Sequence, residues 1–403
     1  MKTEWVHKKL GDCCERLRNG MTYDIEETQG YMVTRIETIS DGFIDYSKVG
    51  YTSVLPCDDY KLIKGDILFS HINSVKHIGK VAYFDDTELL FHGMNLLLIR
   101  ANKVIDNKYL FYILSSENVR RKIRTLAKSA VNQASINTTE LQNFPISYPA
   151  DLSAQRRIAA ILTSADKVIA ATQKTIAKYK QMKQGMMEDL LKPKEGWKKY
   201  EYKDVIIENR LGGNYENSTA NIGYPVIKMG NIMRGYISLE KVQYLSFEKK
   251  YIANDVLKKG DLLFNTRNTL DLVGKVSIWN NELPFALYNS NLLLMKFDEN
   301  IIGSNEFMNY YFNYHKTLME LRGFAIGTTS VAAIYGRDLD RLSIIVPSIK
   351  EQRRIAAILS GIDAKIAAEE KVLEKYEKVK KGLMERMMEG ENKCYSITQM
   401  TSL

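Results

Sequence analysis

The sequence predicts a mixed α/β (α+β) protein, built as an internal repeat of a globular domain followed by a long helix. The first observation is the octapeptide QRRIAAIL, which opens residues 155–191 and again residues 352–388. About half of the aligned positions in these two segments are identical, and no gap is needed. The second observation is that the stretches before the two segments share apolar runs and glycines in the same order. A repeat of this length indicates a tandem duplication.

Both repeated segments are predicted to form coiled-coil helices. Apolar residues recur in them at alternating steps of four and three, from Ile158 to Leu190 and from Ile355 to Met387. A 3.5-residue period sustained over several heptads favours a coiled coil over an ordinary amphipathic helix. Each helix would be roughly 55 Å long at about 1.5 Å per residue. Polar residues at the same seam positions in both copies can fix register; these pairs are Thr172/Glu369 and Lys183/Lys380.

The first globular domain is expected at residues 1–150 and the first long helix at residues 151–192. Short β-branched or aromatic runs between Gly and Asn turns predict an irregular sheet in this domain. The expected strands are residues 31–36, 66–70, 79–83 and 96–100, and a helix is expected at residues 108–127. Asp151 or Ser153 is a suitable N-cap for the long helix. Pro193 ends it, because the residue before a proline leaves the helical conformation.

The second half repeats these elements, with the second domain at residues 193–347 and the second long helix at residues 348–390. The matched motifs are Lys64–Phe69 with Lys259–Phe264, Gly79–Val81 with Gly274–Val276, and Asn95–Leu98 with Asn291–Leu294. The segment Ser348–Glu351 is a capping box, Gly390 is a suitable stop, and residues 391–403 form a polar tail. The globular halves otherwise differ, which favours two modules that recognise different targets over unconstrained drift.

The composition indicates a cytoplasmic protein with a polyanionic partner. The formal net charge of +9 suits nucleic acid, although many basic proteins bind none. No segment approaches about 18 consecutive apolar residues and the first residues do not resemble a signal peptide, so no membrane association is expected. The four cysteines and five histidines form no zinc-binding pattern, and buried free thiols are expected.

The sequence lacks the motifs of the enzymes that a basic duplicated protein could be. Both Gly-Lys pairs are followed by valine, so neither is a P-loop, and HExxH is absent. No two prolines are adjacent, as the Asn/Asp-Pro-Pro-aromatic motif of adenine methyltransferases requires. Asp58–Lys61 faintly resembles a nuclease motif but has no counterpart in the second half. A non-catalytic chain is predicted; the alternatives are a self-contained DNA methyltransferase or nuclease with an unrecognised active site, and a scaffold that reads no bases.

Two divergent α/β domains, each followed by a helix that opens in QRRIAAIL, resemble the specificity subunit of type I restriction–modification systems. The resemblance covers essentially the whole chain, including the doubled G-D-[IL]-L-F segments and the proline that ends each globular part. It implies that residues 1–150 and 193–347 are target recognition domains, each reading one half of a bipartite site on double-stranded DNA. Because the halves differ, the site should be asymmetric. The resemblance also implies two antiparallel spacer helices, related by a pseudo-two-fold repeat, that set the half-site separation.

The same resemblance implies the partners and the place of the cofactors. The helices would dock two methyltransferase (M) subunits, and restriction (R) subunits would join through the complex. S-adenosylmethionine, ATP and Mg²⁺ would be on those partner subunits, with no cofactor in this chain. Because long helices can also associate between chains, a self-dimer of the isolated protein is possible.

Three pairs of polar segments are candidates for DNA contact, because such side chains bind phosphates and base edges. The loop after the first G-D-[IL]-L-F strand gives Ser70, His71, Asn73, Lys76 and His77, and its counterpart gives Asn265, Thr266, Arg267 and Asn268. The second pair gives Lys128, Asn132 and Gln133, answered by Thr328, Thr329 and Arg337, and the third gives Arg35 and Lys228. Each residue alone is more readily explained as a solvated loop residue, so the loops as sets are better candidates than their members. Arg267 is the preferred single candidate, for guanine or phosphate.

Two further pairs of residues repeat on the long helices. Arg156–Arg157 and Arg353–Arg354 occupy the first turn, where cations oppose the helix dipole. An acidic surface on a partner subunit or intramolecular carboxylates would favour them, so they are candidate docking residues; solvated charges are the alternative. Gly185 and Gly382 should each cost about 1 kcal/mol relative to Ala. A close backbone approach or a bend is expected there.

Overall fold

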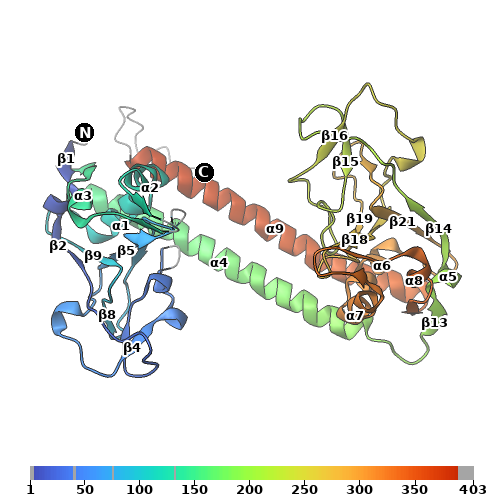
Figure 1. The fold of residues 1–403 in the computed structure, drawn as a ribbon, viewed down its shortest axis with the longest axis horizontal. Helices are drawn as coiled ribbons and strands as arrows, with labels where there is room; N and C mark the ends of the chain where they lie inside the picture. Colours follow the sequence, from blue (N-terminus) through green and yellow to red (C-terminus); the bar gives the residue numbers. More distant parts are fainter. Residues whose placement is uncertain (1–3, 40–41, 75–76, 131–132, 389–403) are drawn as a thin grey trace. The chain divides into compact units, whose positions relative to one another are not determined.

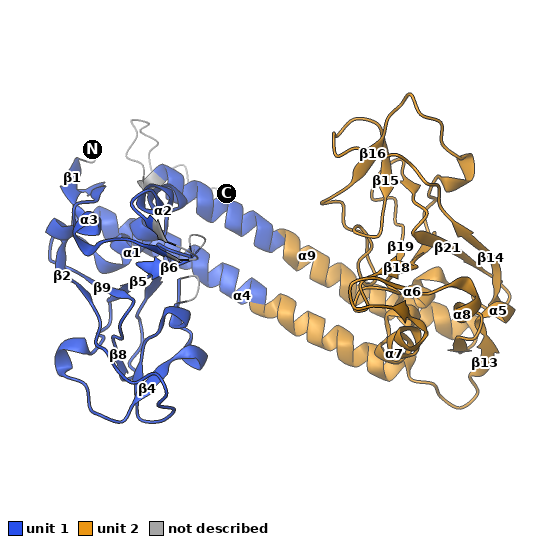
Figure 2. Cartoon of the chain, viewed as in Figure 1, with its two compact units in different colours: residues 1–173, 372–403 blue, residues 174–371 orange. Residues whose placement is uncertain are grey.

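The computed structural model describes residues 4–39, 42–74, 77–130 and 133–388, without the side chains of residues 129, 130, 133, 387 and 388 (Figure 1). The chain divides into two compact units (Figure 2). Unit 1 comprises residues 1–173 and 372–403, and unit 2 comprises residues 174–371. Each unit therefore holds one globular part and a portion of both long helices. Among the described residues, no helix is long and apolar enough to span a membrane.

The globular part of unit 1 is organised around a four-stranded antiparallel sheet in the order β2-β9-β5-β7. Its strands are β2 (Cys14–Asn19), β5 (Ile67–Phe69), β7 (Val81–Tyr83) and β9 (Leu97–Ala101). Three smaller sheets have the orders β4-β3-β8, β10-β11-β6 and β1-β12. Their strands are β1 (Trp5–Lys9), β3 (Tyr31–Val33), β4 (Gly50–Thr52), β6 (Ile72–Asn73), β8 (Leu90–Phe91), β10 (Lys128–Ala130), β11 (Gln133–Ser135) and β12 (Pro145–Pro149). All four strands predicted in this half are present.

Unit 2 repeats these sheets strand for strand, in the orders β14-β21-β17-β19, β16-β15-β20, β22-β23-β18 and β13-β24. The first sheet contains β14 (Ile206–Leu211), β17 (Leu262–Asn265), β19 (Val276–Ile278) and β21 (Leu292–Phe297). The others contain β13 (Lys198–Glu201), β15 (Tyr224–Ile227), β16 (Gln243–Leu245), β18 (Arg267–Asn268), β20 (Leu287–Tyr288), β22 (Ile326–Gly327), β23 (Ala332–Ala333) and β24 (Ser343–Val346). Even the single parallel pairing recurs, β3 with β8 and β15 with β20. The predicted α+β duplication is confirmed.

Glycines shared by the two halves are conformational requirements of this fold. Gly30 and Gly223, which precede β3 and β15, have φ angles of +118° and +129°, which residues with a side chain rarely adopt. A Cβ there would lie 2.3 Å from the carbonyl oxygen of Thr52, or 2.1 Å from that of Leu245, on the neighbouring strand. The agreement at these glycines therefore follows from backbone geometry and does not indicate a ligand.

The helices follow the same repeat. The first half contains α1 (Asn107–Ser115), α2 (Glu117–Arg124), α3 (Thr138–Gln142) and α4 (Leu152–Leu191). The second half contains α5 (Tyr202–Val205), α6 (Asn305–Asn313), α7 (His315–Phe324), α8 (Gly336–Leu339) and α9 (Ile349–Met388). Short 3-10 helices are η1 (Leu10–Cys13), η2 (Ile36–Thr38), η3 (Tyr46–Lys48), η4 (Asp58–Tyr60) and η5 (Ala253–Asp255).

The single helix predicted at residues 108–127 is wrong, because Ser116 divides it into α1 and α2. Ser116 is extended, with ψ of 136°, and its hydroxyl accepts a hydrogen bond from the backbone N–H of Val119 (3.4 Å) at the start of α2. Tyr314, with ψ of 137°, separates α6 from α7 in the same way. The break is therefore a property of the fold that both halves share.

The ends of the long helices largely agree with the predicted caps. The Asp151 carboxylate accepts a hydrogen bond from the backbone N–H of Ser153 (2.8 Å), and α4 ends at Leu191, just before Pro193. Ser348 accepts one from the N–H of Glu351 (3.4 Å). The capping box is only half formed, however, because the Glu351 carboxylate binds Arg354 instead. Gly390 and residues 391–403 lie outside the described residues.

The first residue of the octapeptide ties each long helix to the globular part before it. Gln155 and Gln352 are fully buried. The Gln155 amide accepts from the N–H of Asp106 (2.8 Å), before α1, and donates to the carbonyl of Pro149 (2.8 Å). Gln352 likewise accepts from Gly303 N–H (3.0 Å) and donates to the carbonyls of Ile301 (2.8 Å) and Pro347 (3.0 Å). Apolar octapeptide residues that enter the cores are Ala159, Leu162, Ile355, Ala356 and Leu359. The repeated octapeptide therefore docks a helix onto a domain.

Within each unit the two long helices run antiparallel, and an ion pair joins them. In unit 1, Asp166 of α4 binds Lys380 of α9 (2.5 Å) and accepts a hydrogen bond from the Tyr112 hydroxyl of α1 (2.8 Å). In unit 2, Asp363 of α9 binds Lys183 of α4 (2.7 Å) and accepts one from the Tyr310 hydroxyl of α6 (2.7 Å). The polar seam position Lys183/Lys380 thus pairs one helix with the other, as the coiled-coil prediction requires.

The expectation of a close backbone approach at Gly185 and Gly382 is wrong. A Cβ at either glycine would meet no atom within 4 Å, and both helices continue through them. In unit 2, Gly185 instead lines an open depression of about 450 Å³, beside Tyr314 and His315.

Replacing the buried glutamine at the helix start should destabilise unit 1. The Gln155→Met substitution keeps the volume but leaves buried backbone groups without partners, so the free energy of unfolding should fall by about 1–3 kcal/mol. Urea denaturation of the variant measures this loss. Gln173→Met, at an exposed position of the same helix, is the control and should change stability by less than about 0.5 kcal/mol. Equal stability of the two variants would contradict the docking role of Gln155.

Candidate nucleic-acid interface

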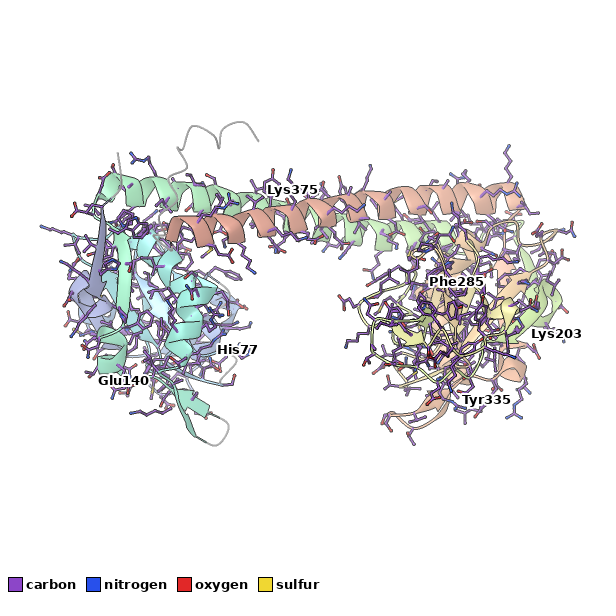
Figure 3. All side chains as sticks on the ribbon, turned by 90° about the horizontal axis from the view of Figure 1, so that it is seen from above. His77, Glu140, Lys203, Phe285, Tyr335 and Lys375 are labelled. Atoms are coloured by element: carbon purple, nitrogen blue, oxygen red, sulfur yellow. The ribbon has the colours of Figure 1, made fainter. Side chains whose placement is uncertain are left out.

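Two of the predicted DNA-contact segments of unit 1 meet in one small sheet. The segment after β5 forms β6, which pairs with β11, and β11 pairs with β10 as a hairpin. Asn73 faces Ala134 across this sheet, and Lys128 faces Ser135. Figure 3 shows the hairpin projecting from the side of unit 1 opposite α4, near the labelled Glu140. Segments that are far apart in the sequence therefore lie side by side in one sheet.

The counterpart in unit 2 has the same register and different side chains. Arg267 and Asn268 of β18 pair with Ala333 and Ala332 of β23. The β22–β23 hairpin turns through Thr328–Ser330, where the two hydroxyls of Thr328 and Ser330 lie 3.1 Å apart. This hairpin also projects from the side of its unit opposite the long helices (Figure 3). Asn73 and Asn268 thus occupy equivalent places, whereas Arg267 stands where unit 1 has Ile72.

The candidates of unit 1 differ in how far they reach solvent. Ser70 and His71 are only 1% and 7% exposed, and Asn73 donates a hydrogen bond to the Ser70 hydroxyl (3.1 Å). Lys128 is exposed and pairs with Glu140 (3.3 Å). His77 lies in the loop between β6 and β7 and is labelled in Figure 3. Lys76 and Asn132 lie outside the described residues, as does the side chain of Gln133. Among the candidates that the structure describes in unit 1, Lys128 is the exposed lysine of this sheet.

His71 lines a shallow depression of about 400 Å³ next to the hairpin. The depression is also lined by Lys128, Ser135 and Asn137. Burial lowers the pKa of His71 to about 4, so the imidazole is neutral at pH 7. Its Nδ1 is buried without a hydrogen-bond partner among the described residues. A neutral imidazole in this position offers either a donor or an acceptor, but no charge.

Arg267 is the most available cation of the unit 2 hairpin sheet. Its side chain is exposed and makes no hydrogen bond or ion pair with the described residues. Asn265 is fully buried, and its Oδ1 accepts from the backbone N–H of Arg267 (3.2 Å). The Thr266 hydroxyl donates to the carbonyl of Asn291 (3.0 Å). Thr329 contributes its carbonyl to Leu270 N–H (3.2 Å), and Arg337 is 79% exposed beside Tyr335. Asn265 and Thr266 therefore position the backbone that carries Arg267.

The third predicted pair belongs to the other three-stranded sheets. Arg35 donates to the Tyr23 hydroxyl (3.2 Å) and to the carbonyl of Ile25 (2.7 Å). Lys228 donates to the side-chain oxygen of Gln243 (2.8 Å) on β16. No hydrogen bond within the described chain joins either residue to a hairpin sheet.

The arginine pairs of the helix starts have partners within their own units. Arg156 lies 3.7 Å from Asp106, and Arg157 lies 3.8 Å from Asp151. Arg354 forms two 2.7 Å contacts with the Glu351 carboxylate, and Arg353 donates to the carbonyl of Gly303 (3.2 Å). Local acceptors thus satisfy these cations in part. The side chains of Arg156, Arg157 and Arg354 remain more than half exposed, so they are still accessible to a partner.

The described residues give no support for two enzymatic sites, a metal centre and the nuclease-like motif. They contain no group of three His, Cys, Asp or Glu side chains placed to hold a metal ion. The nuclease-like segment forms η4, where Asp59 pairs with Arg16 (3.3 Å) and Arg18 (3.8 Å). Cys13 is a buried free thiol as expected, whereas Cys57 is exposed, which corrects the expectation of buried thiols.

Sequence reasoning missed three cations of unit 2, namely Arg234, Lys275 and Arg322. They lie in a loop, at the start of β19 and on α7, and no motif joins them. The sequence could have drawn attention to Lys275, because it belongs to a Gly-Lys-Val segment that is repeated in both halves.

Comparison with known proteins identifies relatives over the whole length. The family model described as the type I restriction modification DNA specificity domain matches residues 2–181 and again residues 194–378. A putative type I restriction enzyme MjaX specificity subunit from Methanocaldococcus jannaschii is 35% identical, over 96% of this chain and 93% of that protein. A putative type I restriction enzyme specificity subunit, S.HindORF215P, from Haemophilus influenzae is 28% identical over 66% of each chain.

Solved structures share the fold at low sequence identity. The S subunit of a type I restriction–modification system from M. genitalium superposes with a TM-score of 0.65 at 15% identity, covering 97% of both chains. A chain from a study of complex assembly and conformational transition of the type I R-M system gives a TM-score of 0.55 at 16% identity, covering 96% of this chain and 99% of that one.

Acidification should destabilise unit 1 through its buried histidines. Burial lowers the pKa of both His71 and His92 to about 4, whereas a histidine in the unfolded chain titrates near 6.5. As the pH falls below about 6.5, only the unfolded state takes up these protons, so stability is lost until about pH 4. At pH 5 the loss should be about 2 kcal/mol per histidine. Thermal unfolding at pH 7 and 5 measures it, and His71→Gln should weaken the dependence. An unchanged pH dependence in that variant would refute the assignment to His71.

Proposed function

Because the chain belongs to the family of type I restriction–modification DNA specificity proteins, we propose that it is the DNA sequence-specificity subunit of such a complex. Each globular part reads one half of an asymmetric bipartite site on double-stranded DNA. The chain contributes recognition, and the chemistry of methylation and cleavage belongs to other subunits.

The observation that carries the proposal is the pair of hairpin sheets with one register and two sets of side chains. In each unit a two-residue strand follows a buried strand and pairs with a hairpin. The two-residue strands are β6 and β18, and the buried strands before them are β5 and β17. Arginine and asparagine at base edges discriminate guanine and adenine in the major groove. A hairpin sheet with Arg267 and Asn268 and one with Ile72 and Asn73 would therefore select different half-sites.

The long helices support the other part of the proposal, a fixed gap between the half-sites. Each contains 40 residues, about 60 Å at about 1.5 Å per residue. A continuous helix resists changes of length far better than a flexible linker of the same residue number. Two readers on such a spacer impose one half-site separation, as in dimeric DNA-binding proteins.

Partner subunits complete the proposed function. The relatives are named as specificity subunits of restriction enzymes, which supports assembly with methyltransferase and restriction subunits. We infer that the helices dock two methyltransferase subunits, that Arg156, Arg157, Arg353 and Arg354 take part, and that S-adenosylmethionine, ATP and Mg²⁺ are bound by the partners. Self-association of the isolated chain through the helices is an additional expectation that light scattering tests.

The enzyme alternative is tested directly with the purified chain. Incubated with plasmid DNA and either S-adenosylmethionine or Mg²⁺, the chain alone should neither methylate nor cleave, whereas a self-contained enzyme would. The decisive experiment for the proposal is to map methylated bases in a genome with and without this gene. A split motif with one fixed gap is expected, and methylation that does not depend on the gene would overturn the proposal.

Arg267→Ala should weaken recognition of one half-site. Losing a bidentate contact with a base costs about 1–3 kcal/mol, a weakening of binding of roughly 5- to 150-fold, and relaxes the methylated motif at one position. A phosphate contact would instead lower affinity for every sequence alike. Fluorescence anisotropy and methylation mapping separate these outcomes. Lys203→Ala, at an exposed lysine of α5 in the same unit, is the control and should bind as the unaltered chain does (Figure 3). If both affinity and motif are unchanged in the Arg267 variant, its proposed contact with DNA is wrong.

A further inference from the structure

Three cations from separate elements of unit 2 act on one another electrostatically. Arg234 lies in the loop after β15, Lys275 immediately precedes β19, and Arg322 is in the last turn of α7. Burial lowers the pKa of Arg234, and the charge of Arg322 lowers it further. Burial likewise lowers the pKa of Lys275, with an added contribution from Arg234. The backbone shows the same neighbourhood. Gly235 N–H, next to Arg234, donates to the carbonyl of Val276 (2.9 Å), next to Lys275, and a Cβ at Gly274 would lie 3.7 Å from the Leu321 Cβ, next to Arg322.

The fold supplies little negative charge to balance this cluster. Arg234 donates through Nη2 to the backbone carbonyl of Asp271 (3.0 Å), and the Asp271 carboxylate favours its charged form. Among the described residues, no salt bridge involves Arg234, Lys275 or Arg322. The Asp271 carboxylate thus acts on Arg234 alone among the three, and like charges held together without a counterion cost stability. Such an arrangement is relieved when an anion binds.

Unused hydrogen-bond donors lie in the same region. Arg234 Nη1 is buried and has no partner among the described groups, and the same holds for Nδ2 of the fully buried Asn265. Asn265 lies beside Gly274 and Lys275 of the neighbouring antiparallel strand, since Asn265 N–H donates to the Lys275 carbonyl (2.8 Å) and Gly274 N–H to the Asn265 carbonyl (2.9 Å). Two residues thus face one, as in a β-bulge, with Gly274 at a φ of +75°. An unsatisfied amide donor therefore lies next to the backbone that carries Lys275.

The region adjoins the proposed DNA-reading sheet. Asn265 is the last residue of β17, and its Oδ1 accepts from the backbone N–H of Arg267, the preferred DNA contact. The next residue, Thr266, accepts through its carbonyl from Ile334 N–H (2.9 Å), just after β23. An anion held by the cations would lie beside the hairpin sheet, where the backbone of bound DNA must pass if the sheet contacts base edges.

We propose that Arg234, Lys275 and Arg322 form a clamp for a phosphodiester of the DNA bound by unit 2. The inference rests on the proposed function and adds a positioning role, since a phosphate contact fixes the register of the duplex without reading its sequence. Guanidinium groups suit this task because their planar donors match phosphate oxygens. In the aligned sequence of the first half, Lys80 and Arg124 correspond to Lys275 and Arg322, but Asp41 stands in place of Arg234. The full clamp is therefore a feature of the second half alone.

The test is the salt dependence of DNA binding by the full chain assembled with its methyltransferase partner. Each lost phosphate contact should reduce the slope of log K against log salt concentration by about 1. DNA binding is measured for the Arg234→Gln and Lys275→Met variants, and thermal unfolding verifies that each variant folds. Two variants are used because Arg234 is partly buried, whereas a substitution of Lys275 is less disruptive to the fold. Affinity should fall alike for cognate and scrambled duplexes, and the methylated motif should be unchanged. Lys316→Gln, on α7 like Arg322 but in its first turn, is the matched control and should keep the slope.

The outcomes separate the clamp from the proposed function. An unchanged salt slope in both clamp variants, with specific binding intact in the unaltered protein, overturns the clamp and leaves the function standing. No sequence-specific binding by the unaltered protein overturns the function itself. In the last part of the test, inorganic phosphate is added at constant ionic strength. If the variants lose only stabilisation by inorganic phosphate and keep their DNA slope, the site belongs to a free anion and the clamp is wrong.

Discussion

The structure depends on two equivalent clusters in which an aspartate joins a tyrosine of the globular part to a lysine of the opposite helix. Tyr112, Asp166 and Lys380 form one cluster, and Tyr310, Asp363 and Lys183 form the other. The aspartates and lysines are 25–39% exposed, so each ion pair contributes modestly to stability. Their value is geometric, because a slip of the helix register would separate the ammonium from the carboxylate. A polar pair in an apolar seam is an established way to select one register.

Together with the buried glutamines, these clusters make each globular part and the helix ends beside it a single packed body. Gln155 binds the start of α4 to the turn before α1, and Asp166 then receives the hydroxyl of Tyr112 from the same α1. The helix is fixed at two places along its length, so it cannot roll against the domain. This explains why the octapeptide is kept in both copies while the surface loops differ.

The sequence was sufficient for the features that depend on local pattern. Such features can be predicted from the spacing of residues along the chain. They are the repeat, the heptad seam, the N-cap at Asp151 and the buried strand before each hairpin sheet. Features that depend on pairing between distant segments could not be predicted from the sequence. Nothing near Asn73 indicates that it faces Ala134, and nothing near Arg234 indicates that Arg322 lies close by. The division of the predicted helix at Ser116 was missed because the apolar residues on either side of Ser115–Asn118 were joined into one helix, although Ser116 followed by Glu117 is a suitable helix start.

The placement of small residues behind the hairpin sheets explains how recognition can change without disturbing the fold. Ala134 and Ala332 are each 1% exposed and face Asn73 and Asn268. Because the buried side of the hairpin needs only a methyl group, its stability does not depend on which polar side chains occupy the neighbouring strand. Ile72 and Arg267 can therefore stand at equivalent positions of strands that pair in the same register. A substitution in the helix seam breaks a contact between the two helices, whereas a substitution in β6 or β18 alters what the outer surface offers to a partner. A duplicated chain of this design can keep one scaffold and diverge into two different readers.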